Sequence, residues 1–289
     1  MKLCKIPNYL KDKNFDDEIK YLEIVPKLGY YELHIKYEAQ EKEVKSGANN
    51  WASIDLGMNN LCTVTSNKTH AFILNGRAIK SINQKFNKKI ATAKSKAKKS
   101  NNKNITKEIS RLYTKRGNKL NQEIHKITDF LVQSVLTHNI DFIVLGYNKG
   151  WKIGASMGKR TNQNFVQIPF SKILNQLIYK LQLEGIEVHL QEESYTSKTS
   201  YFDNEPIKRH QTYKGKRINR GLFQTKNGLL INADVNGSLN IYRKFILNIQ
   251  EVHDVLLEPV DTGLVMNPIK INLRTSTSIG SVLTLIQSL

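Results

Sequence analysis

The chain has 289 residues, 39% of them hydrophobic, which suits one large globular domain or one domain with appendages. It has no run of about 18 apolar residues, and its first residues lack the apolar stretch of a signal peptide, so we expect neither a membrane span nor secretion. Cys4 and Cys62 are far apart, which excludes a disulfide framework and a cysteine-based zinc site as main features. The formal charge of +19 indicates a polyanionic partner, because neutralising phosphates releases condensed counterions.

The positive charge is concentrated in two segments. Residues 85–126 hold fourteen Lys or Arg and two Glu, a local charge of +12, and residues 208–226 hold seven Lys or Arg. Such segments indicate binding surfaces, although for the second a solvated loop is an equal alternative. The basic residues that we expect to contact nucleic acid are Lys88, Lys89, Lys96, Lys98, Lys99, Arg111, Lys115, Arg116, Lys152, Lys159, Arg160, Lys198, Lys216, Arg217 and Arg220.

The first half of the chain predicts strands followed by basic helices. Residues 18–25 and 30–37 are typical of two strands joined by a turn. Short apolar runs at 51–56, 61–66 and 71–75 predict an antiparallel meander of three strands. The polar, lysine-rich residues that follow predict helices that need a partner to be fully ordered.

The second half alternates helices and buried strands. Apolar residues spaced three to four apart predict a helix over 120–138, and 141–145 reads as a buried parallel strand. A loop of about twenty residues follows, then a helix that we expect to begin at Ser171 and to end at Gly185. A strand over 186–190 and a helix over 234–245 complete the series.

This order predicts an RNase H-like mixed α/β fold. Strand–helix–strand steps require parallel pairing with right-handed crossovers. Three antiparallel strands followed by two parallel strands, with helices on the faces, is the order of that fold. Because fold alone does not give function, the carboxylates must decide it.

Two aspartates stand where such a fold would need metal ligands. Asp55 lies inside an apolar strand, where a charge costs several kcal/mol unless it is paired or metal-bound; the alternative is a turn aspartate before Gly57. Asp234 opens the last helix, and there the alternative is an N-cap, a role compatible with metal binding. Carboxylate clusters hold Mg²⁺ or Mn²⁺ in two-metal nucleases, so we expect one of these ions as cofactor.

Four short motifs occur in the order in which one family has them. Residues 54–61 resemble the first RuvC motif of the TnpB (OrfB) family of bacterial insertion sequences, and 232–241 resemble its third. Residues 195–198 resemble its Thr-Ser-Lys element, and 125–128 its His-Lys-Ser/Thr element. The resemblance implies a metal-dependent, RNA-guided DNA endonuclease with a RuvC-like site, ancestral in type to type V CRISPR effectors. Its implied partners are a guide RNA from its own element and target DNA, with no membrane partner.

One departure from the family concerns the metal site. Gly146 stands where members usually carry Glu, at the end of the strand over 141–145. Some relatives, including the Fanzor proteins, carry a rearranged glutamate on the next strand, and here that position is Glu193. A glutamate can bridge neighbouring strands about 4.8 Å apart, so Asp55, Glu193 and Asp234 form the expected ligand set. The alternative for Glu193 is a surface residue, and Glu192 is less suited because side chains alternate faces.

Two further departures concern neighbouring regions. Residues 199–231 contain no cysteine, so we expect no zinc ribbon and no zinc. Only about fifty residues precede Asp55, so we expect an N-terminally shortened member, either naturally truncated or a decayed copy. We expect an N-terminal β remnant over 1–48, a nuclease domain over 49–245 and a partly disordered tail over 246–289. Within the nuclease domain we expect a basic helical insertion over 82–117 and a basic loop over 199–231.

Three functions fit these residues. The first is the metal-dependent RNA-guided nuclease, in the cytoplasm and associated with the nucleoid. The second is an RNA-guided DNA-binding protein inactivated as a nuclease by Gly146. The third is a transposon remnant without activity.

Overall fold

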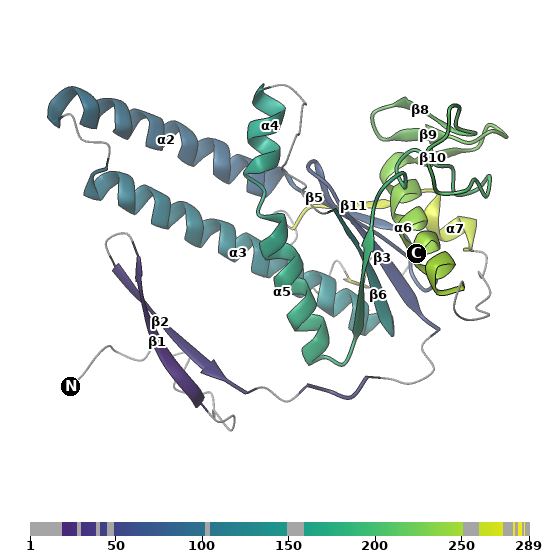
Figure 1. Ribbon diagram of the computed structural model, residues 1–289, viewed down its shortest axis with the longest axis horizontal. Coiled ribbons are helices and arrows are strands. Elements are labelled where there is room, and N and C mark those ends of the chain that lie inside the picture. The colour runs from purple at the N-terminus through teal and green to yellow at the C-terminus, as the bar shows by residue number, and fades with distance from the viewer. Residues whose placement is uncertain are drawn as a thin grey trace.

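The computed structural model describes residues 19–27, 30–38, 41–44, 49–101, 105–148, 159–250 and 260–273, together with 280, 283, 284 and 286. Within these ranges, no helix combines the length and the apolar character that crossing a bilayer requires. An N-terminal hairpin of β1 (Ile19–Lys27) and β2 (Tyr30–Tyr37) precedes the main body (Figure 1).

A six-stranded mixed sheet forms the centre of the molecule, in the order β11-β5-β4-β3-β6-β7. Strands β3 to β5 make the antiparallel meander, and β6 and β7 run parallel to β3, which confirms the RNase H-like order. The bounds are β3 (Trp51–Leu56), β4 (Asn60–Ser66), β5 (Phe72–Asn75), β6 (Phe142–Tyr147), β7 (Glu187–Glu192) and β11 (Ile269–Ile271).

Helices cover both faces of this sheet, and the side chains of β3 and β4 are therefore buried on both sides. On one face, Ile54 and Phe72 join a core with Phe130 of α3 (Lys107–Thr137) and with α5 (Phe170–Leu183). On the other face, Trp51 stacks on Tyr242 of α6 (Ala233–Gln250), with ring centroids 3.5 Å apart. Residue alternation therefore assigns every second side chain of β3 to the α6 side.

The basic insertion is a pair of long helices, α2 (Arg77–Asn101) and α3, which lie side by side (Figure 1). Ile82, Phe86 and Ile90 of α2 pack with Leu112 and Leu120 of α3. The helices expected here are present. Each has a row of apolar side chains that packs against the other helix. The helix predicted over 120–138 is the second half of α3, which begins much earlier.

Two local predictions in the middle of the chain are wrong. The long loop after Gly146 contains a helix, α4 (Lys159–Val166), and residues 149–158, including Lys152, lie outside the described part. Helix α5 begins at Phe170 rather than after a Ser171 cap, because the Pro169 carbonyl already accepts from Ile173 N at 3.1 Å. The predicted end at Gly185 is confirmed by its φ of +73°.

Two regions predicted as irregular contain strands. Residues 199–231 include a small antiparallel sheet of β8 (Lys216–Asn219), β9 (Leu222–Gln224) and β10 (Leu230–Asn232), which lies beside the start of α6 (Figure 1). The described part of the C-terminal segment carries α7 (Thr262–Val265) and β11, which pairs with β5. These strands have three or four residues, too few for a period of two to be visible in the sequence.

Candidate active site

Three carboxylates share one electrostatic environment on the α6 side of the sheet. Asp55 is the fifth residue of β3, Glu193 follows β7, and Asp234 lies in the first turn of α6. Burial raises the pKa of Asp55 well above its ordinary value, and Glu193 and Asp234 raise it further, while Arg217 opposes them. The structure thus places the three expected ligands near enough to interact electrostatically, and their role as metal ligands and catalytic residues stays a prediction.

Asp55 is a strand residue and not a turn residue. It pairs with Thr63 of β4, and its Oδ2 would lie 3.0 Å from a Cβ on Gly237 of α6. The absence of a side chain at Gly237 therefore allows the helix to approach this carboxylate. Asp55 is therefore not an aspartate that serves only the turn before Gly57.

Asp234 is not the N-cap of α6. The cap is Asn232, whose Oδ1 accepts from Asp234 N at 3.0 Å and from Val235 N at 3.3 Å. The Asp234 carboxylate instead accepts from Asn60 Nδ2 at 2.5 Å and lies 3.8 Å from the Arg217 guanidinium. Because the cap is supplied by Asn232, the Asp234 carboxylate can face the site.

Glu193 fills the space beside Gly146. A Cβ built on Gly146 would lie 2.3 Å from Glu193 Oε1 and 2.7 Å from Ile241 Cδ1. Glu193 N also donates to Tyr147 O at 3.2 Å, which fixes the backbone of the turn after β7 against β6. The carboxylate thus lies where a side chain at 146 would begin, and glycine at 146 leaves room for it.

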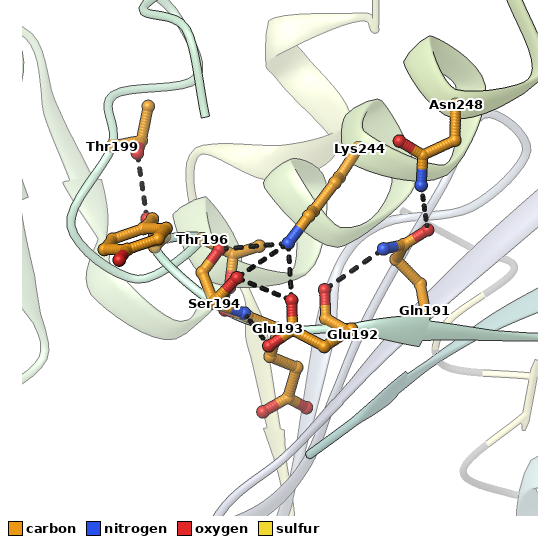
Figure 2. A network of polar contacts seen from close by, with 9 residues as sticks. Gln191, Glu192, Glu193, Ser194, Thr196, Thr199, Lys244 and Asn248 are labelled. Atoms are coloured by element: carbon orange, nitrogen blue, oxygen red, sulfur yellow. Dashed lines mark hydrogen bonds and ion pairs between the residues drawn. The ribbon is translucent and has the colours of Figure 1, made fainter. Parts of the chain in front are cut away.

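The neighbouring Glu192 serves a different purpose. It is exposed and accepts from Lys244 Nζ at 2.7 Å and from Ser194 Oγ at 2.5 Å, in the network of Figure 2. Burial would raise the pKa of Glu192, but hydrogen bonds from Lys244 and Ser194 outweigh it and leave this pKa lowered. Glu192 therefore ties the end of β7 to α6 through Lys244 and takes no part in the electrostatic cluster around Asp55.

Polar residues of α6 that sequence reasoning missed lock the helix to the site. Ser238 Oγ donates to Ser53 O at 3.0 Å and contacts Thr65 Oγ1 at 2.9 Å, all buried. Asn236 and Asn240 donate to the Thr199 carbonyl at 2.8 and 2.7 Å. The signal was available, because polar side chains recur on one face of an otherwise buried helix, where each requires a partner.

The donor set suits a hard divalent cation. Within the described ranges, no three His, Cys, Asp or Glu side chains are already arranged as ligands of one ion. The three acids nevertheless offer carboxylate oxygens, which Mg²⁺ prefers. A cation would also compensate the charge that makes ionised Asp55 costly beside Glu193 and Asp234. The residues therefore fit such an ion once the carboxylates move together.

Basic residues of the β8–β9 hairpin stand over this site. A cleft of about 490 Å³ is lined by Asp234, Asn60, Arg217 and Arg220 among others. A second hollow of about 550 Å³ is lined by Lys198, Lys216 and Arg217. Arg217 and Arg220 thus line a cleft together with Asp234, whereas Lys198 and Lys216 line the neighbouring hollow, whose lining holds none of the three carboxylates.

The remaining predicted basic residues lie on the helical pair or outside the described part. A groove of about 1000 Å³ between α2 and α3 is lined by Lys88, Lys89, Lys96, Arg111 and Lys115. Lys98 and Lys99 are exposed in the last turn of α2. Arg116 differs, because it is half-buried and donates to Asn83 Oδ1 at 3.0 Å, which joins the two helices. Lys159 and Arg160 lie in α4, and their side chains are not described.

Comparisons with known proteins agree on one group. Residues 34–152 match the OrfB_IS605 family, described as a probable transposase, and residues 170–241 match the Cas12f1-like TNB domain. The TnpB-like protein ORF457 of Acidianus two-tailed virus is 26% identical over 78% of this chain and 48% of its own length.

The fold also has a counterpart among solved structures. A chain of the cryo-EM structure of the Cas12f1–sgRNA–target DNA complex aligns with a TM-score of 0.57 and 18% identity. The alignment covers 79% of this chain and 46% of that chain. The chain thus spans about half the length of the relatives that it matches, and at this identity the structural likeness concerns the fold.

Proposed function

Because this chain belongs to the TnpB (OrfB) family, we propose that it is a transposon-associated, RNA-guided DNA endonuclease that hydrolyses phosphodiester bonds with a divalent metal. One observation carries the proposal. Asp55, Glu193 and Asp234 come from three separate elements and meet closely enough to raise the pKa of Asp55. Surplus negative charge in a buried place is costly to stability. Carboxylates perturbed in this way therefore indicate a functional site.

In this proposal the three carboxylates hold Mg²⁺ or Mn²⁺. Bound cations would supply an attacking hydroxide and stabilise the leaving oxygen. Asn60 orients the Asp234 carboxylate by its hydrogen bond. Arg217 and Arg220 bind the phosphate backbone in the cleft. A phosphate there would take the place of the Asp234 carboxylate as the partner of Arg217.

The proposed partners are a guide RNA from the same element and a target DNA. The likeness in fold to a chain bound to sgRNA and target DNA supports both kinds of partner. The groove between α2 and α3 is the proposed seat of the RNA or its duplex with DNA, because five lysines or arginines of the predicted set line it. Phosphate contacts of this kind position a nucleic acid without reading its sequence.

The test is DNA cleavage by the chain co-expressed with RNA transcribed from its own element. Asp55→Ala and Asp234→Ala should each abolish cutting in Mg²⁺ and retain RNA. Glu192→Ala is the matched control, since it removes an adjacent acid that faces Lys244, and it should cut at the parent rate. Cutting that survives in either aspartate variant would contradict the proposal.

A second candidate is an RNA-guided DNA-binding protein without nuclease activity. It is favoured by Gly146 at the usual glutamate position and by the lack, among the described residues, of three ligands already set for one ion. It predicts occupancy of target DNA that is the same with and without divalent metal, and no cleavage in Mg²⁺ or Mn²⁺.

A further inference from the structure

Strand β11 lies beyond both matched segments, the later of which ends at residue 241, yet it contributes to the candidate active site. Its central residue, Lys270, lines the same cleft as Asp234, Asn60 and Arg220. The strand is held firmly, since it pairs with β5 and Ile269 N donates to Ala71 O at 2.9 Å. Lys270 is therefore positioned in the cleft by the central sheet and not by a loop.

The sheet register shows which way Lys270 faces. Asp55 pairs with Thr63, Thr63 pairs with Ile73, and Ile73 pairs with Lys270, so the four residues form one row across β3, β4, β5 and β11. Directly paired residues project from the same face of a sheet. Lys270 thus stands on the Asp55 side, three strand spacings or about 14 Å from it.

The cleft that Lys270 lines has the charge that a phosphate chain requires. Of the residues that line it, Arg217, Arg220 and Lys270 are basic and Asp234 alone is acidic. Lys80 stands close by and donates to Asn59, another residue of the lining. Burial lowers the pKa of Lys80, and the nearby Arg220 and Arg77 lower it further, which shows how closely positive charge is gathered here.

We propose that Lys270 binds a backbone phosphate of the nucleic-acid strand that enters this cleft, opposite the arginines of the β8–β9 hairpin. The strand is then gripped from two sides, by Arg217 and Arg220 on the hairpin and by Lys270 on the sheet edge. An exposed lysine keeps its solvated ammonium until a phosphate reaches it, and the contact is independent of base sequence. This inference rests on the proposed function, and it assigns a substrate contact to a segment outside the family-matched regions.

The first test is lysine acetylation, followed by mass spectrometry, of the full chain with its RNA. A short oligothymidylate serves as probe, and metal is omitted so that nothing is cut. Lys270 should be protected by the oligonucleotide. Lys68 is the matched control, because it is also exposed but lies in the turn beyond the opposite end of β4. Equal acetylation of Lys270 with and without oligonucleotide would overturn the proposal.

The second test is the salt dependence of oligothymidylate binding. Lys270→Gln should reduce the magnitude of the slope of log affinity against log salt by about 0.7. If the affinity at 1 M salt is unchanged, this corresponds to about fivefold weaker binding at 0.1 M salt. Lys270→Arg and Lys68→Gln should keep the parent slope. An unchanged slope in Lys270→Gln, with cleavage intact in the parent, refutes this inference alone. A reduced slope, with no cleavage even in the parent, supports the phosphate contact and refutes the nuclease function.

Discussion

Gly146→Ala should slow cleavage by displacing Glu193, with only a moderate cost to the stability of the fold. The new methyl group would lie 2.3 Å from Glu193 Oε1, whereas ordinary contact begins at 3.4 Å, so the carboxylate must move by about 1.1 Å. Misplacement of a reacting group by about 1 Å costs on the order of 100-fold in rate. We therefore expect single-turnover DNA cleavage about 100-fold slower than in the parent.

A double-mutant cycle separates this effect from general damage. Glu193→Ala alone should be at least as slow as Gly146→Ala, and the double variant no slower than Glu193→Ala, because both changes act on one carboxylate. Thermal unfolding gives the control. Ile241 Cδ1 lies 2.7 Å from the new methyl, and crowding of this kind costs about 1–3 kcal/mol in stability. Cleavage at the parent rate in Gly146→Ala, or additive losses in the double variant, would refute the placement of Glu193.

The other predictions concern charge and buried hydrogen bonds. Because the pKa of Asp55 is raised, the folded chain holds a proton that the unfolded chain has released above pH 3.8. The free energy of unfolding therefore falls as pH rises from 3.8 to the raised pKa of Asp55. Asp55→Asn should therefore raise the free energy of unfolding at pH 7, and denaturant titrations should show the gain vanishing below pH 3.8; a gain independent of pH would contradict this. Glu205→Ala should cost about 3 kcal/mol, because the buried carboxylate accepts from Ser200 N at 2.9 Å and Lys214 N at 2.7 Å; the exposed Glu187→Ala is the control, and equal effects of the two would show that these bonds are unimportant. Ser238→Ala should cost about 1–2 kcal/mol by chemical denaturation, since it leaves Thr65 without its buried partner, and an unchanged midpoint would argue against that network.

The sheet and the three acids were predictable because each has a local signal. Asp55 interrupts an apolar strand, and the family motifs carry Asp55 and Asp234. Glu193 could be chosen over Glu192 because alternate residues of a strand face opposite sides, and the structure places the two on different partners.

The surroundings of the site were less predictable because their signals are short or non-local. Strands β8 to β11 have three or four residues each, and only their pairing identifies them. Asn232 and Asp234 are both good N-caps, so composition alone could not assign the cap to Asn232. The cleft position of Lys270 depends on β11 joining β5, a pairing of residues about 200 positions apart in the chain.

The most direct measurement is anomalous diffraction from crystals of the chain soaked in Mn²⁺. Mn²⁺ should be bound by carboxylate oxygens of Asp55 and Asp234, with Glu193 drawn in beside them, and no such ion should be present in Asp55→Asn. Crystals that bind Mn²⁺ elsewhere, or that leave these three acids without it while the chain still cuts DNA, would contradict the assignment of this site.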